Sequence, residues 1–316
     1  MTDPSQFNFP HAASSGSQNP VQVRAAALVA ASEAALSGRS LWQDALRRLF
    51  QNTAAVTAMG ILAAIVVLVT VGPLLSPYGG NDTVEAIQGP GIASGHYFGT
   101  DLDRRDLFVR TLEGGRVSLM IGIVATLVSL LIGVTYGAVA GYFGGMVDEV
   151  MMRIVDILYA MPFIFFVILL MVIFGRDIVL IFIAIGAINW LDMARIVRGQ
   201  TLSLRNKEFI EAAQATGVAA PTIIRRHIVP NLLGIVAVYV TLTVPQVILV
   251  ESFLSFLGLG VQEPATSWGV LVNEGAVVID VYPWMLIFPA AFLAVTLFCL
   301  NFIGDGLRDA LDPKDR

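Results

Sequence analysis

The amino-acid sequence predicts an all-α protein that crosses a membrane six times. Of its 316 residues, 56% are hydrophobic and only 14% are charged, and the mean hydropathy is +0.76. A soluble domain averages about 25% charged residues. Runs without charge recur along the chain, and a membrane helix needs about 20 apolar residues. Their positions are 54–75, 117–147, 157–175, 178–191 (the shortest), 228–250 and 281–304.

The N-terminal part contains two different segments. Residues 1–40 are rich in small and polar residues, and the first 20 contain no Lys or Arg. A signal peptide needs a basic region before an apolar core, so we expect a flexible cytoplasmic tail. Residues 41–53 are amphipathic, which predicts a helix on the membrane surface. Its apolar face consists of Leu41, Trp42, Ala45, Leu46 and Leu49.

The remaining chain divides into crossings and loops. We expect a first crossing at 54–75, an outer loop at 76–116, a core of five crossings at 117–304 and a cytoplasmic tail at 305–316. The run 117–147 is too long for one crossing. Its last part, "YGAVAGYFGG", therefore predicts a turn after a crossing at about Ser118–Val139. Only Arg176 and Asp177 separate the third and fourth runs, which predicts a tight helical hairpin.

Basic residues predict the orientation in the membrane. If the N-terminus is inside, the inner segments hold 14 of the 19 Lys and Arg residues. Lys and Arg are enriched in cytoplasmic loops. We therefore expect both termini, and the loop 205–230, on the cytoplasmic side.

The loop 205–230 predicts a helix, a glycine turn and a second short helix. Glu208 and Glu211 fall early in the first helix, where its dipole favours carboxylates. Ala212 and Ala213 keep one side slim, and Gly217 is suited to the left-handed turn that ends a helix.

The second short helix is expected to start near Pro221 and to end before the next crossing. Arg225, Arg226 and His227 lie near its C-terminal end, where positive charge is favoured. Pro230 disfavours helix at the residue before it. We call residues 205–230 the coupling loop.

Motifs for chemistry on this chain are missing from the sequence. No Gly is followed by Lys, so no phosphate-binding loop of the G-x-x-x-x-G-K type exists. The three histidines, His11, His96 and His227, are scattered, and Cys299 is the single cysteine. The net charge of −5 argues against a nucleic-acid partner. We expect no catalytic residue, no metal and no cofactor held by this chain.

Several stretches resemble one family. "EAAQATG", nine residues and then "HIVP" resemble the coupling loop of the integral-membrane permease subunits of ABC importers. The stretches 98–122, 251–269 and 301–316 are similar to peptide and nickel permeases. With 189–213, they resemble the C-type subunit of the oligopeptide permease. The departures are Arg104, where the family usually has Gly, and Val109, where it usually has a small polar residue.

The resemblance implies the type I permease fold, a bacterial inner-membrane location and a set of partners. These are a second permease, two ATPases that bind ATP and Mg, an extracytoplasmic peptide-binding protein and membrane lipid. It also implies that the coupling loop docks on an ATPase and moves as a rigid body. The residues implied to couple are Glu208, Glu211, Ala212, Ala213, Gly217, His227 and Pro230.

Ionisable residues at the membrane margins allow two interpretations each. Asp192 and Arg195 have the spacing of a helical ion pair, but an intramembrane carboxylate also indicates a transport pathway. Arg153 and Asp156 repeat that spacing. Glu251 either lines the pathway or anchors the apolar run 252–262, which is too short to cross and could dip into the membrane or cap the pathway.

Two further functions stay open from the sequence. Cargo other than oligopeptides, namely dipeptides or nickel, would suit the same family. A secondary transporter driven by an ion gradient would need ionisable residues at mid-membrane. The five longer apolar runs contain none, so an ATP-driven importer is the preferred interpretation.

Overall fold

The computed structural model describes residues 41–174 and 178–311, and this part of the chain consists of helices and connecting loops. The chain forms two units, Met1–Asp44 and Ala45–Arg316, and every contact given below lies within the second. The predicted tail 1–40 and the predicted hairpin residues Arg176 and Asp177 lie outside the described residues.

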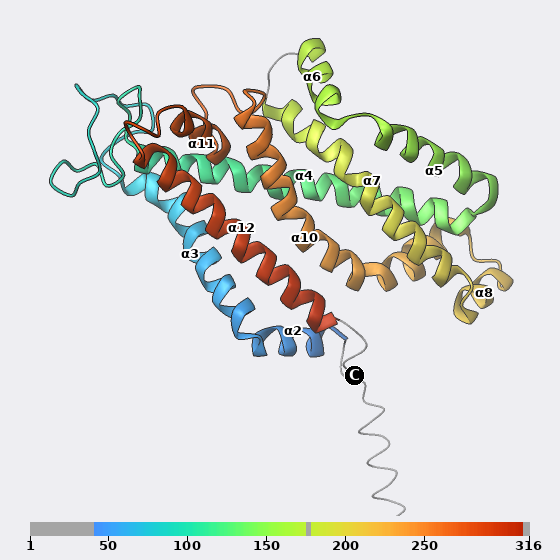
Figure 1. Ribbon diagram of the computed structural model, residues 1–316. Coiled ribbons are helices and arrows are strands. Elements are labelled where there is room, and N and C mark those ends of the chain that lie inside the picture. Colours follow the sequence, from blue (N-terminus) through green and yellow to red (C-terminus); the bar gives the residue numbers. More distant parts are fainter. Residues whose placement is uncertain (1–40, 175–177, 312–316) are drawn as a thin grey trace, which may run out of the picture. The chain divides into compact units, whose positions relative to one another are not determined.

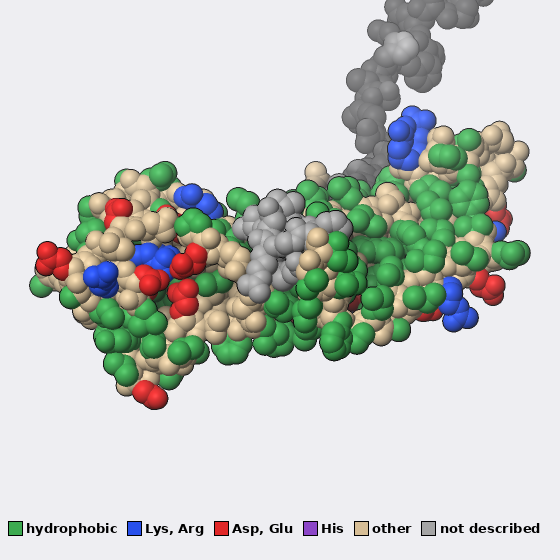
Figure 2. Space-filling view, turned by 90° about the horizontal axis from the view of Figure 1, so that it is seen from above, with side chains coloured by type: hydrophobic (Ala, Val, Ile, Leu, Met, Phe, Trp, Pro, Cys, Tyr) green, Lys and Arg blue, Asp and Glu red, His purple; other side chains and the backbone are tan. Residues whose placement is uncertain are grey.

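Four helical stretches are long and apolar enough to cross a membrane. They are α3 (Thr53–Leu75), α4 (Leu107–Phe143), Ala220–Phe256, which ends in α10 (Val229–Phe256), and α12 (Trp284–Leu311). A fifth candidate pairs α5 (Gly145–Ala160) with the start of α6 (Phe163–Phe174), with a bend of 89° between them. In Figure 2, hydrophobic side chains cover the middle of the visible face, and charged side chains gather towards its ends.

The predicted number of six crossings is not confirmed among the described residues. The remaining long helix, α7 (Ile178–Arg205), has 28 residues but is not one of the candidates. Its second half contains charged residues, which lower the mean hydropathy of the helix. The predicted apolar run ended at residue 191, before these residues. The charged residues are Asp192, Arg195, Arg198 and Arg205.

The predicted turn in "YGAVAGYFGG" is wrong, because α4 continues as a helix to Phe143. The glycines instead allow α7 to pack closely along α4. A Cβ on Gly133 would lie 2.6 Å from Cβ of Met193, and one on Gly141 would lie 2.7 Å from Cβ of Thr201. Gly137 lies between them against Ala194, and glycines four residues apart let helix backbones approach in this way.

The N-terminal end of α4 lies ten residues before the predicted one. The side chain of Asp106 accepts a hydrogen bond from the backbone N–H of Val109 at 2.8 Å and caps the helix at Leu107. The loop 76–106 precedes it. Figure 1 shows this loop and α11 (Trp268–Val277) at one end of the helices and α8 (Glu208–Ala215) at the opposite end.

Two smaller predictions need revision. α10 continues to Phe256, so the run 252–262 starts as helix rather than as a separate segment. α2 (Leu41–Gln51) is helical as predicted, but part of its apolar face packs on protein. Ala45 and Leu49 are buried against Ala310 of α12, whereas Leu46 is 49% exposed.

Candidate functional site

The first half of the coupling loop is the helix α8, which ends in a left-handed glycine. The N–H of Val218 donates to the carbonyl of Ala213 at 3.1 Å, and the N–H of Gly217 donates to the carbonyl of Gln214 at 3.0 Å. The φ of Gly217 is +78°. This pair of bonds is the Schellman ending of a helix. The predicted helix and glycine turn are therefore confirmed.

α8 has an anchored side and an exposed side. Ile210 is fully buried in one cluster with Ile223 and Ile228, and the side-chain amide of Gln214 donates to the hydroxyl of Tyr142 on α4 at 3.4 Å. The anchoring makes α8 a fixed projection of the helices beneath it. Of the residues implied to couple, Glu208, Glu211 and Ala212 are exposed and Ala213 is half-buried.

Two apolar residues on the exposed side were missed by the sequence analysis. Phe209 is 44% exposed and Val218 is 36% exposed. Buried aromatic and apolar anchors dominate most protein interfaces, so these side chains extend the candidate contact surface. The sequence could have indicated them, because a large apolar residue in a polar loop often packs against a binding partner.

The second short helix is not separate from the crossing that follows it. α9 (Ala220–Ile223) continues through a π-helical turn, η1 (Ile224–Ile228), into α10. The prediction that Pro230 ends this helix is wrong. Pro230 lies just after the π-helical turn, and the helix continues through it. His227 is half-buried, and its carbonyl accepts a bond of 2.6 Å from the side chain of Asn231.

Ionic contacts tie α7 to the turn between α4 and α5. The Arg198 guanidinium donates from Nε and Nη2 to both carboxylate oxygens of Asp148, at 2.7 and 2.6 Å. Nη1 of Arg205 donates to the carbonyl of Phe143, the last residue of α4, at 3.2 Å. A bidentate pair fixes orientation as well as distance. The chain entering α8 is thereby bound to two other helices.

The predicted ion pairs within α7 and within α5 are replaced by one pair between them. Nη2 of Arg195 donates to Asp156 at 2.8 Å, and its guanidinium carbon lies 4.4 Å from the centre of the Tyr159 ring. Asp192 forms no hydrogen bond or ion pair with any described residue, and Arg153 is exposed. Sequence spacing cannot distinguish these arrangements, because α5 packs beside α7.

Glu251 lies in a buried cluster of hydroxyl groups. Its carboxylate accepts from Ser118 of α4 at 3.1 Å and from Ser255 at 2.7 Å, and its side chain is fully buried. The Ser118 hydroxyl also accepts from the backbone N–H of Trp268 at 3.2 Å. The contacts favour the anchoring interpretation of Glu251 over the pathway interpretation.

An ion network joins the loop 76–106 to the segment after α10. Arg105 donates to Asp101 at 2.8 Å and to Glu263 at 3.0 Å. Burial alone would lower the pKa of Arg105, but the contacts with Asp101, Glu263 and Asp103 together raise that pKa. His96 Nδ1 lies 2.6 Å from the Asp106 carboxylate. The sequence analysis did not identify this network.

Arg104, which stands where the resembled family usually has Gly, has an unusual backbone conformation. Its φ is 65°, in the left-handed region that Gly adopts at no steric cost. A glycine, the residue usual in the resembled family, would fit this turn without strain.

Comparisons with known proteins cover nearly the whole described chain. Residues 133–316 match the family "Binding-protein-dependent transport system inner membrane component", and residues 40–103 match "N-terminal TM domain of oligopeptide transport permease C". The chain is 59% identical to an "Oligopeptide transport system permease protein OppC" of Haemophilus influenzae, over 90% of this chain and 92% of that protein.

Two more similarities agree with these matches. The protein of the same description from Salmonella typhimurium is 61% identical, over 89% of this chain and 94% of its own length. An inward-facing structure of the MetNI methionine ABC transporter has a TM-score of 0.52 at 20% identity, over 65% of this chain and 96% of that one, and shares the fold. The chain therefore belongs to the family of binding-protein-dependent transport system inner membrane components, among the oligopeptide permease C sequences.

Proposed function

We propose that this chain is one of two permease subunits of an ATP-driven oligopeptide importer in the bacterial cytoplasmic membrane. The observation that carries the proposal is α8, an exposed helix anchored from below by Ile210 and closed by Gly217. Its relatives at 59–61% identity carry the description of oligopeptide permease C, which supports this cargo over dipeptides or nickel.

The coupling loop transmits force from partner ATPases that hold ATP and Mg. Phe209, Val218 and the slim Ala212 enter a cleft on an ATPase, in the way that a helix docks into a groove. The bonds Arg198–Asp148 and Arg205–Phe143 carry the resulting displacement into α5 and α4. ATP binding thus rocks the helices between inward-open and outward-open states, a hinge and shear motion.

The finer topology follows from the same proposal. The chain crosses six times with both termini in the cytoplasm, the bent pair α5–α6 forms the third crossing, and α7 forms the fourth. A charged half of α7 is compatible with a crossing when its polar side faces water or protein. The binding protein delivers substrate at the end of the helices that holds the loop 76–106.

Reconstitution tests this function directly. The chain is co-expressed with its second permease and two ATPases, and proteoliposomes containing the binding protein are supplied with ATP. We expect uphill uptake of oligopeptides, weaker uptake of dipeptides and no uptake of Ni²⁺. ATPase activity should co-purify with the complex and be absent from this chain alone. Uphill uptake by the isolated chain, driven by an ion gradient without ATP, would refute the proposal in favour of a secondary transporter.

A further inference from the structure

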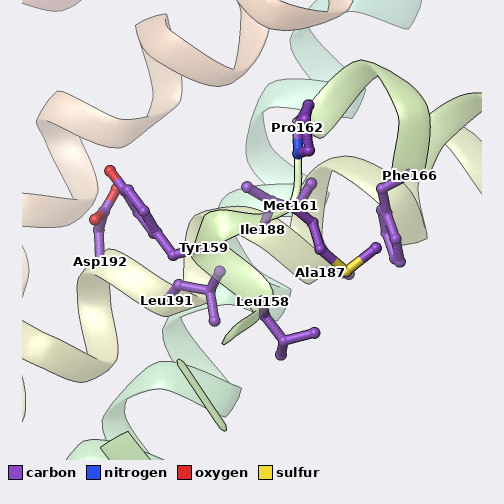
Figure 3. Close-up of a pocket in the computed structure, with 9 residues that line it drawn as sticks. All are labelled: Leu158, Tyr159, Met161, Pro162, Phe166, Ala187, Ile188, Leu191 and Asp192. Atoms are coloured by element: carbon purple, nitrogen blue, oxygen red, sulfur yellow. The ribbon is translucent and has the colours of Figure 1, made fainter. Parts of the chain in front are cut away.

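The cavity beside Asp192 has a polar end and an apolar end. It has a volume of about 380 Å³ and lies between α7 and the bend that joins α5 to α6. Figure 3 shows the Asp192 carboxylate and the Tyr159 hydroxyl turned towards each other at one end, and Phe166 with Met161 at the other. Ligand pockets usually have 300–1,000 Å³, mostly apolar walls and a few polar groups. This cavity has those properties.

Asp192 forms no hydrogen bond or salt bridge with a described residue, although it lies close enough to Arg195 for electrostatic attraction. Arg195, one turn further on α7, is held by Asp156 and by the face of Tyr159. The Arg195 guanidinium hydrogen-bonds to Asp156 rather than to Asp192, so no described cation forms a hydrogen bond with the Asp192 carboxylate. Asp192 is half-buried, and a carboxylate is stabilised by a cation or by hydrogen-bond donors. A cationic ligand entering the cavity would supply both.

Two acceptor groups line the polar end of the cavity, and a third lies near them. The Asp192 carboxylate comes from α7, the Tyr159 hydroxyl from α5, and Tyr239 of α10 lies close enough to interact electrostatically with both. A protonated amine has three N–H donors and no acceptor. Aromatic rings add a favourable cation–π contribution. The set suits an alkylammonium group rather than an anion.

The surroundings indicate that this face of the subunit meets water or protein. Asp192 lies 14 residues after Ile178, at the middle of the 28-residue helix α7. The side chain of Asp156 is 56% exposed and that of Arg195 is 38% exposed. Charged groups within membrane helices face a bundle interior or a water-filled cavity rather than lipid.

We propose that the cavity is a subsite of the translocation pathway that binds the N-terminal ammonium group of the peptide. The ammonium group contacts Asp192 and Tyr159, and the first side chain of the peptide lies towards Met161 and Phe166. The inference rests on the proposed function, because it presumes that peptides pass this subunit.

Photolabelling of the purified four-subunit complex tests the subsite without the binding protein, whose own selectivity then plays no part. The probe is a tetrapeptide that lacks Lys and Arg and carries a benzophenone side chain at position 1. We expect labelling within 158–166 or 187–192. The same peptide with an acetylated N-terminus should label these segments about tenfold less, because one charge-assisted contact is lost. With the benzophenone at position 4, labelling should move away from these segments, because the photoreactive group then lies three residues from the bound N-terminus.

Variants separate a subsite from a structural role. Asp192→Asn should lower labelling and the rate of peptide uptake about tenfold, and Asp192→Glu should restore part of both. Glu149→Gln, which removes an exposed carboxylate of α5 that does not line the cavity, should change neither. Unchanged labelling by Asp192→Asn overturns the inference. Failure of the Asp192→Asn complex to assemble also overturns it, because Asp192 would then pair with the second permease. Absence of peptide uptake by the wild-type complex refutes the proposed function instead.

Discussion

The Ser118 hydroxyl on α4 donates to the carboxylate of Glu251 on α10 at 3.1 Å, although 133 positions separate the two residues. The same hydroxyl accepts from the backbone N–H of Trp268 at the start of α11. One buried cluster therefore holds three helices together at the end of the bundle that contains the loop 76–106.

Replacing Glu251 should destabilise this end of the subunit. Glu251→Ala leaves buried hydroxyl groups without an acceptor, and we expect a loss of about 2–4 kcal/mol in the free energy of unfolding. Glu251→Gln keeps one acceptor oxygen and should cost about 1 kcal/mol. Thermal unfolding of the complex in detergent measures both. An Ala variant as stable as the wild type would show that the cluster contributes nothing.

Gly217 should be required for coupling rather than for folding. Its φ of +78° is strained for a β-branched residue, and no atom lies within 4 Å of an added Cβ. Gly217→Val should therefore reorient α8 and lower peptide uptake at least about tenfold, while ATP hydrolysis continues. Gly217→Asn is the matched control, since Asn tolerates this conformation. The prediction is contradicted if both variants import peptide normally.

The close contact of α4 and α7 should be sensitive to volume. Gly141→Val brings a Cβ to 2.7 Å from Cβ of Thr201, and overpacking of this kind costs about 1–3 kcal/mol. Gly199→Ala, on α7 with open space around its Cβ, should leave the melting temperature unchanged or higher. Equal melting temperatures for the two variants in detergent would be inconsistent with close packing.

The Arg198–Asp148 pair should act as a unit. Asp148→Asn and Arg198→Gln should each destabilise the protein by about 1 kcal/mol, since the Arg198 side chain is 37% exposed. The double variant should cost little more than either single one. If the pair also transmits motion, both single variants should lower the number of peptides imported per ATP hydrolysed. Strict additivity of the two stability changes would show that the residues are not coupled.

Glu274 should make stability depend on pH. Burial raises the pKa of its carboxyl group, and Arg110, whose Nη2 lies 3.9 Å from Oε1, lowers it only in part. The pKa of Glu274 is therefore higher in the folded protein than in the unfolded chain. Its contribution to the free energy of unfolding is fully present below the ordinary carboxyl pKa and is lost as the pH rises through the pKa of the folded state. Glu274→Gln should remove this dependence. The melting temperatures of the variant and the wild type should be equal at acid pH. At neutral pH, the melting temperature of the variant should be higher.

The sequence determined the features that depend on local chemistry. Uncharged runs of about 20 residues predicted the long apolar helices, since backbone groups in lipid must bond within their own segment. Likewise, "EAAQATG" predicted α8 and its glycine turn, because the preference of Gly217 for the left-handed conformation needs no distant partner.

Tertiary structure alone decided the contacts between helices. The glycines of α4 predicted a turn by composition, yet α7 packs on them and keeps them helical. Arg195 had Asp192 at the right spacing but pairs with Asp156, because α5 brings a second carboxylate within reach. Pattern and spacing determine which groups a helix carries, whereas their partners depend on which helices pack together. That choice depends on contacts between residues far apart in the chain.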